Sequence, residues 1–201
     1  MKKILALLLL LAGGVAFADE SVDVCYNYGC NQEATVRFSD RQLRTLAKRL
    51  RSLPSPAEER KTLAEVIGQM YSWAGQQSPV YADKGGNAFD DEVNGAMDCI
   101  DHSTTTTRFL KMLERRGLLK YHVVADVERR RRFFLFDHFS AVVQEFPRPV
   151  RASAVDHGTA EKSKTHQYVI DSWFVDNGES AVVLPLEDWM NGAGPKVEPN
   201  Y

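Results

Sequence analysis

The first half of the chain carries two segments in which apolar residues recur at helical spacing. One begins after Ser39-Asp40 and ends before Pro54. The other opens with Ser55-Pro56-Ala57-Glu58, which combines a capping box with proline at the first helical position. The spacing predicts two amphipathic helices. Their apolar positions are Leu43, Leu46, Ala47 and Leu50 in the first, and Leu63, Val66, Ile67, Met70 and Ala74 in the second.

A third helix is predicted to start after Asp98, which is a good N-cap residue. Asp101 places a carboxylate in the first turn, at the positive end of the helix dipole, and Gly117 supplies the C-terminal stop. The helix face consists of Cys99, Ser103, Thr106, Leu110 and Leu113. Cys99 is therefore expected in the first turn of a well-capped helix.

The second half of the chain carries strand patterns. Apolar and β-branched residues gather in 121–127, 133–146, 167–175 and 181–186. The segment 133–146 is apolar on both alternating faces, as expected for a central strand, and Asp176-Asn177-Gly178 predicts a hairpin turn. Helices followed by antiparallel strands predict an α+β fold, with N-terminal helices packed on an antiparallel sheet.

Polar segments connect these elements. Residues 76–95 are rich in Gly, Asn, Asp and Ser and predict a long ordered loop, and a polar stretch over 147–165 interrupts the strand patterns. The basic run Arg129–Arg132 lies between two apolar segments. It predicts a solvated hairpin turn, with contact to an anionic partner as the alternative.

The N-terminus has the pattern of a signal peptide. Lys2 and Lys3 precede an apolar run from Ile4 to Leu11, and Ala16-Phe17-Ala18 offers a cleavage site. The run is shorter than the roughly 20 residues of a membrane-spanning helix, so an uncleaved anchor is the weaker interpretation. We therefore expect residues 1–18 to be removed, a single domain over 19–191, and a loosely held tail over 192–201. The mature protein is expected to be periplasmic or extracellular, without stable membrane insertion.

Composition changes this picture little. The chain is 44% hydrophobic and 26% charged, which fits one globular domain with a sizeable core. Its net charge of −2 creates no field that would attract nucleic acid, so we expect no nucleic-acid partner. The sequence does not indicate an oligomeric state.

Cysteine usage is more informative, because the chain has three cysteines and an exported protein meets an oxidising compartment. Cys25 and Cys30 are close in sequence, and Gly29 between them favours a tight turn. We interpret them as a small disulfide loop at the mature N-terminus; a redox-active pair is the alternative. Cys99 then remains without a partner.

A cysteine thiol becomes nucleophilic when a helix N-terminus and a neighbouring imidazole lower its pKa. The predicted helix gives Cys99 the first of these. Among the five histidines, His138 is the best candidate for the second, because it lies inside a predicted central strand and needs a hydrogen-bond partner there. Asp171 is likewise a carboxylate within an apolar strand, where it is costly to bury alone. On neighbouring strands, Asp171 would orient His138 toward Cys99, and N–H groups at the helix start would stabilise an oxyanion.

This order of residues resembles the transglutaminase-like branch of the papain-like superfamily, including the bacterial transglutaminase-like cysteine proteinases. The resemblance rests on Met97-Asp98-Cys99-Ile100-Asp101, on His138 heading His138-Phe139-Ser140-Ala141-Val142, and on Asp171 in Val169-Ile170-Asp171-Ser172-Trp173. It implies a papain-like core and a catalytic triad of Cys99, His138 and Asp171. The chain departs from the family pattern at Met97, where glycine is usual, and at Phe139, where a small residue is usual. The gap from His138 to Asp171 is also long for the family, which implies that 147–165 are an inserted loop, a candidate lid.

The resemblance implies a thiol enzyme that transfers acyl groups from peptide or protein amides. The expected export of the protein makes cell-envelope peptides or proteins candidate substrates. Acceptance by water would make it a peptidase or amidase, and acceptance by an amine a transamidase. No cofactor and no metal are expected. The main alternative is a non-catalytic periplasmic binding module of the same fold, and disulfide exchange at Cys25 and Cys30 is a third interpretation.

Each candidate residue also has a structural interpretation. Cys99 is then a buried thiol, His138 a core histidine bonded to a backbone carbonyl, and Asp171 a turn-forming residue. His102 is a second candidate base, one helical turn beyond Cys99, although neighbours on one helix stack along its axis. Cys99, Asp101 and His102 offer a zinc ligand set, but their spacing matches no established pattern. The segment 184–189, which ends in Trp189, is assigned a packing role at the domain edge.

Overall fold

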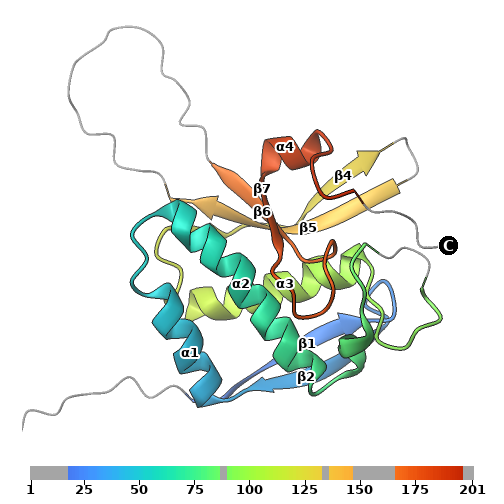
Figure 1. Cartoon of the computed structure of the whole chain (residues 1–201), viewed down its shortest axis with the longest axis horizontal. Coiled ribbons are helices and arrows are strands. Elements are labelled where there is room, and N and C mark those ends of the chain that lie inside the picture. Colours follow the sequence, from blue (N-terminus) through green and yellow to red (C-terminus); the bar gives the residue numbers. More distant parts are fainter. Residues whose placement is uncertain (1–17, 87–89, 133–135, 147–165, 197–201) are drawn as a thin grey trace, which may run out of the picture.

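The computed structural model describes residues 18–86, 90–132, 136–146 and 166–196 (Figure 1). The predicted signal peptide therefore lies outside the described residues except for Ala18. The predicted inserted loop at 147–165 and the last five residues of the tail also lie outside them. Among the described helices, none is long and apolar enough to span a bilayer.

All three predicted helices are present, and their predicted faces are buried except at Cys99, which is partly exposed. They are α1 (Asp40–Leu50), α2 (Pro56–Gly75) and α3 (Cys99–Arg115), and a short 3-10 helix, η1 (Pro79–Ala82), lies inside the predicted loop. The N-terminus of each of the three α-helices is capped by the side chain of the preceding residue: Ser39, Ser55 and Asp98. The capping box predicted at Ser55 is half formed. The Ser55 side chain accepts from the Glu58 amide, but in this described helix the Glu58 side chain does not bond back to the Ser55 amide.

Strands precede the helices as well, contrary to the prediction. β1 (Glu20–Tyr26) and β2 (Gln32–Phe38) form an antiparallel hairpin whose register sets Val22 opposite Val36. Val24 and Phe38 are fully buried in the main core. The physical reason is a period-2 apolar pattern on both sides of the Cys25–Cys30 turn, which the helix-first interpretation overlooked.

The main sheet is antiparallel and contains the predicted strands in modified form. Its members are β3 (His122–Val124), β4 (Glu128–Arg132), β5 (Phe136–Glu145), β6 (Gln167–Asp171) and β7 (Val182–Pro185). The order is β3-β5-β6-β7, with β4 paired to β5 as well, so β5 is central as predicted. The fold class is therefore α+β. The connection from β6 to β7 is longer than the predicted turn, because β6 already ends at Asp171.

The arginine run is a strand and not the predicted solvated turn. β4 pairs with β5 in a register that sets Arg131 opposite Asp137 and Arg130 opposite His138. Arg129 and Arg131 form ion pairs with Asp137, whereas Arg130 is buried against the ring of Trp189, 4.6 Å from its centroid. Alternation along the strand thus gives two arginines an acidic cross-strand partner and the third an aromatic one.

The two faces of the sheet have different covers (Figure 1). Ala141, Val143 and Ile170 join the core that contains α2 and α3, and α3 lies between the sheet and the β1–β2 hairpin. Val142 and Val169, which alternate with them, pack on Trp189 of the short helix α4 (Leu186–Met190). Side chains of β5 and β6 therefore point alternately toward α3 and toward α4.

Candidate active site

The N-terminus of α3 is held by two carboxylates and by the disulfide loop. Asp98 accepts hydrogen bonds from the amides of Ile100 and Asp101, and Asp101 accepts from the Asp98 amide, which completes a capping box. Cys25 and Cys30 form the predicted disulfide. The amides of Tyr28 and Cys30 donate to Asp101 at 2.8 and 2.6 Å. Cys99, which begins the helix, is thereby fixed in place.

The sulfur of Cys99 lies beside the main chain of β5. Its Sγ is 3.8 Å from the carbonyl oxygen of Asp137, and the amide of Phe139 also hydrogen-bonds it. These two groups flank His138, and alternating residues of a strand direct their polar groups to the same side. His138 itself pairs with β4 on the other side. The sulfur therefore occupies the edge of β5 that faces away from β4, level with His138.

His138 and Asp171 are in contact, as predicted. Nε2 of His138 lies 2.8 Å from Oδ2 of Asp171, and Asp171 is almost fully buried while the His138 side chain is 13% exposed. Asp171 also accepts a bond of 3.3 Å from the amide of Trp173. Both side chains are on the α4 face of the sheet, since His138 and Asp171 alternate in phase with Val142 and Val169.

Trp189 is the residue of this site that the sequence did not reveal as functional. It is fully buried, and its Nε1 donates to Oδ2 of Asp171 at 2.9 Å, so Asp171 holds the imidazole and the indole at once. The ring of His138 packs 5.6 Å from Trp189, 4.8 Å from Trp173 and 5.4 Å from Phe174. The packing role assigned to Trp189 is present, but it serves the His138–Asp171 pair.

The thiol is protonated in this arrangement. Burial, together with the carboxylates of Asp98 and Asp171, raises the pKa of Cys99 to about 11. The expected lowering of the pKa is therefore wrong, because burial and these carboxylates outweigh the amides that donate to the sulfur. Within the described part of the chain, Sγ of Cys99 and the ring of His138 do not form a hydrogen bond. Asp171 holds Nε2 of His138, so an interaction of this ring with the sulfur would use Nδ1.

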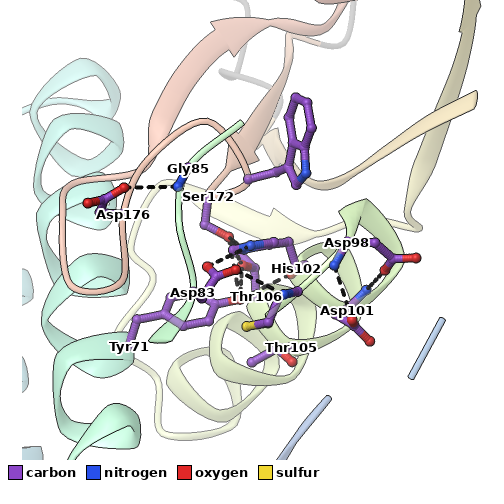
Figure 2. Close-up of polar contacts among 12 residues, drawn as sticks. Tyr71, Asp83, Gly85, Asp98, Asp101, His102, Thr105, Thr106, Ser172 and Asp176 are labelled. Atoms are coloured by element: carbon purple, nitrogen blue, oxygen red, sulfur yellow. Dashed lines mark hydrogen bonds and ion pairs between the residues drawn. The ribbon is translucent and has the colours of Figure 1, made fainter. Parts of the chain in front are cut away.

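A second polar cluster lies on the opposite face of the sheet, around His102 (Figure 2). Its Nε2 lies 3.1 Å from Oδ2 of Asp83, and its Nδ1 lies 2.9 Å from Oγ of Ser172. All three side chains are buried. Because His102 is buried, a substrate has no access to its ring, and this disfavours His102 as the catalytic base.

The zinc set considered from the sequence is not assembled. Asp101 is used by the disulfide loop, His102 by Asp83 and Ser172, and Cys99 by the main chain of β5. The described residues do bring Cys25, Cys30 and Asp101 close together, but the two sulfurs of that group are bonded to each other.

Comparison with known proteins gives no assignment: no family model matches the chain, and no curated protein or solved structure gives a significant match. The site must therefore be judged on its own geometry.

Proposed function

We propose that the protein is an exported thiol enzyme of the transglutaminase-like, papain-like type, in which Cys99, His138 and Asp171 transfer acyl groups from peptide or protein amides. The observation that supports this most directly is the position of the Cys99 sulfur on the main chain that flanks His138, while Asp171 holds the far nitrogen of the same ring. The Cys25–Cys30 disulfide is consistent with a periplasmic or extracellular location.

The raised pKa of Cys99 determines the first step of the proposed reaction. A neutral thiol attacks only as its proton leaves, so Nδ1 of His138 takes the proton from Sγ while the sulfur bonds to the amide carbon. Asp171 stabilises the imidazolium that forms. The imidazolium then protonates the leaving amine, and a thioester remains on Cys99. Attack by water or by an amine releases the acyl group and the thiol.

In the proposed mechanism, one N–H group at the helix start is left to stabilise the oxyanion of the tetrahedral intermediate. The amides of Ile100 and Asp101 are taken up by the Asp98 side chain, and the His102 amide bonds the Asp98 carbonyl. The amide of Cys99 points to its own sulfur, which makes it the N–H group at the helix start that is best placed to stabilise the oxyanion.

Alkylation of Cys99 by iodoacetamide tests the proposal without a known substrate, because Cys99 is the one cysteine outside the disulfide. We expect alkylation near pH 7 to be faster in the wild type than in His138→Ala, which lacks the ring that takes the thiol proton. His122→Gln, in a separate buried cluster, serves as control. A rate that increases only toward pH 11 and is identical in His138→Ala would contradict the proposal.

The raised pKa also favours one alternative, a non-catalytic binding module that keeps the three residues for packing. In that case the Cys99 sulfur would serve as an acceptor for the Phe139 amide, and it would stay unreactive until the protein unfolds. The alkylation profile separates the two functions.

A further inference from the structure

Strand β6 leaves its partner β5 just where the Cys99 sulfur is found. The two strands pair from Gln144↔Gln167 to Ala141↔Ile170, and β6 ends at Asp171. If the pairing continued in the same register, Ser172 would lie opposite Phe139. The main chain of β6 would then bond the groups of β5 that the sulfur now contacts. The position of Cys99 therefore requires β6 to turn away after Asp171.

Ser172 is drawn off the sheet by hydrogen bonds to α3 (Figure 2). Its Oγ lies 2.9 Å from Nδ1 of His102 and 2.9 Å from Oγ1 of Thr106. Tyr71 of α2 completes the cluster at 3.4 Å from Ser172. Every member is buried, so no water competes strongly for these bonds.

Asp83 fixes the other end of this cluster to the segment that carries Cys99. One carboxylate oxygen accepts from the Met97 amide at 2.9 Å, and the other lies 3.1 Å from Nε2 of His102. Residues on both sides of Cys99 are thus held by one carboxylate. A continuous chain of polar contacts leads from Met97 through Asp83 and His102 to Ser172, the neighbour of Asp171.

We propose that Ser172 and His102 are positioning residues of the Cys99 site: they hold β6 away from β5 beyond Asp171 and so keep open the strand edge that the sulfur occupies. This inference rests on the proposed function for its catalytic consequence. Its structural consequence can be measured independently: whether the β5 edge is occupied by the Cys99 sulfur or by the main chain of β6.

Ser172→Ala is the direct test, with Ser172→Thr as the variant that keeps the hydroxyl. Alkylation of Cys99 near pH 7 should be slower in Ser172→Ala by about tenfold to a hundredfold, as expected when a reacting group is displaced by about 1 Å. Its pH profile should resemble that of His138→Ala, and Ser172→Thr should restore the wild-type profile. Ser78→Ala is the matched control, since it removes a buried hydroxyl bonded to the Ala74 carbonyl, outside the cluster.

NMR of the same variants separates the two proposals. We expect the Phe139 amide to change its exchange rate in Ser172→Ala, and cross-strand contacts between Phe139 and residue 172 to appear. An unchanged Phe139 environment together with an unchanged alkylation profile would overturn the positioning role. If instead His138→Ala leaves the wild-type profile intact, the proposed function fails, and the Phe139 signals alone decide whether Ser172 holds the edge open.

Discussion

At the scale of single residues, the site depends on one carboxylate that serves two rings. Asp171 binds the imidazole of His138 and the indole of Trp189, and Arg130 holds the helix of Trp189 by donating to the carbonyls of Trp189 and Ala193. Sequence reasoning identified His138 and Asp171 because each is a polar residue in an apolar strand. Trp189 gave no such signal, because a tryptophan after a strand is most simply explained by packing.

Trp189→Phe should weaken the site while largely preserving the packing. The substitution keeps an apolar ring but removes the Nε1 donor, so the buried Asp171 carboxylate loses one hydrogen bond. We expect the free energy of unfolding to fall by about 1–3 kcal/mol, the usual cost of a lost bond to a buried charged group, and Cys99 alkylation near pH 7 to slow. Urea denaturation and iodoacetamide kinetics measure the two effects.

Trp73→Phe is the control for this prediction. Trp73 is half-buried, and its ring packs on Phe38 of β2 in the main core. Trp73→Phe should reduce the free energy of unfolding without changing the pH profile of Cys99 alkylation. Equal alkylation kinetics in Trp189→Phe and the wild type would show that the indole only fills space.

His102 should make stability depend on pH. Burial lowers its pKa, but the carboxylates of Asp83, Asp171 and Asp101 outweigh burial, so the pKa lies above its ordinary value. Tyr71 is the other titratable group that contacts the ring. Burial raises the pKa of its hydroxyl above the ordinary value, so Tyr71 stays neutral in this pH range. A raised folded-state pKa means that the stabilisation is complete below the unfolded value of about 6.5 and is lost as the pH rises through the folded value.

The measurement is the difference in free energy of unfolding between the wild type and His102→Gln. It should be largest near pH 6 and should shrink toward pH 9. Asp101, whose pKa burial and Asp98 raise to about 6, titrates in both proteins and largely cancels in the difference. A difference that stays constant across this range would mean that the pKa of His102 is the same in the folded and the unfolded protein, which would contradict the prediction.

At the scale of elements, the disulfide loop acts as a second cap on α3. Asn27, Tyr28 and Cys30 have φ values of 62°, 63° and 57°, a left-handed conformation that costs non-glycine residues about 1–2 kcal/mol each. The conformation turns the amides of Tyr28, Gly29 and Cys30 toward the carboxylates of Asp101 and Asp98. The disulfide and these bonds together offset the cost.

Replacing both disulfide cysteines by serine should therefore loosen the start of α3. We expect a loss of about 2 kcal/mol in the free energy of unfolding, the entropic estimate for so short a loop. Amide hydrogen exchange at residues 98–102 should also accelerate, because the donors to Asp98 and Asp101 are no longer held in place. Wild-type protein treated with dithiothreitol should behave in the same way. Unchanged exchange at residues 98–102 would contradict the role of the disulfide loop as a second cap on α3.

Helices could be predicted from the sequence more fully than strands, for a physical reason. The stripes of α1, α2 and α3 extend over several turns, and capping residues mark their starts. The strands are short, and their limits depend on partners distant in sequence. The arginines of β4 lie in a strand because Asp137 forms an ion pair with Arg131 and the ring of Trp189 packs on Arg130. Similarly, β6 ends at Asp171 because α3 binds Ser172, which no local pattern reveals.

The candidate site was predictable to the same extent. The contact of His138 with Asp171 follows from two polar residues on neighbouring strands, and the place of Cys99 follows from its helix cap. The pKa of Cys99 and the cluster of His102 were not predictable. The pKa of Cys99 depends on burial and on the carboxylates of Asp98 and Asp171. The cluster of His102 depends on Asp83, which lies in the loop before α3 and shows no pattern that marks it.

At the scale of the whole molecule, a second buried charged group joins the helices to the sheet away from Cys99. Glu59, in the first turn of α2, is fully buried. Its carboxylate accepts from the amides of Lys120 and Tyr121 and from Nδ1 of His122, which begins β3. Arg60 contacts the other nitrogen of His122 and pairs with Glu145 of β5. The strand β5 is therefore anchored at one end by this cluster, while its other end carries His138.

Glu59→Ala should consequently unfold the molecule more readily without altering the chemistry of Cys99. Two amides and one imidazole nitrogen would lose their acceptor in a buried place, which typically costs roughly 3–5 kcal/mol. Its exposed neighbour Glu58 gives the matched control, and Glu58→Ala should cost under about 1 kcal/mol. Under conditions where both variants remain folded, the pH profile of Cys99 alkylation should match that of the wild type. A profile altered by Glu59→Ala would instead show that the two ends of β5 are coupled, and that the site depends on the position of the whole strand.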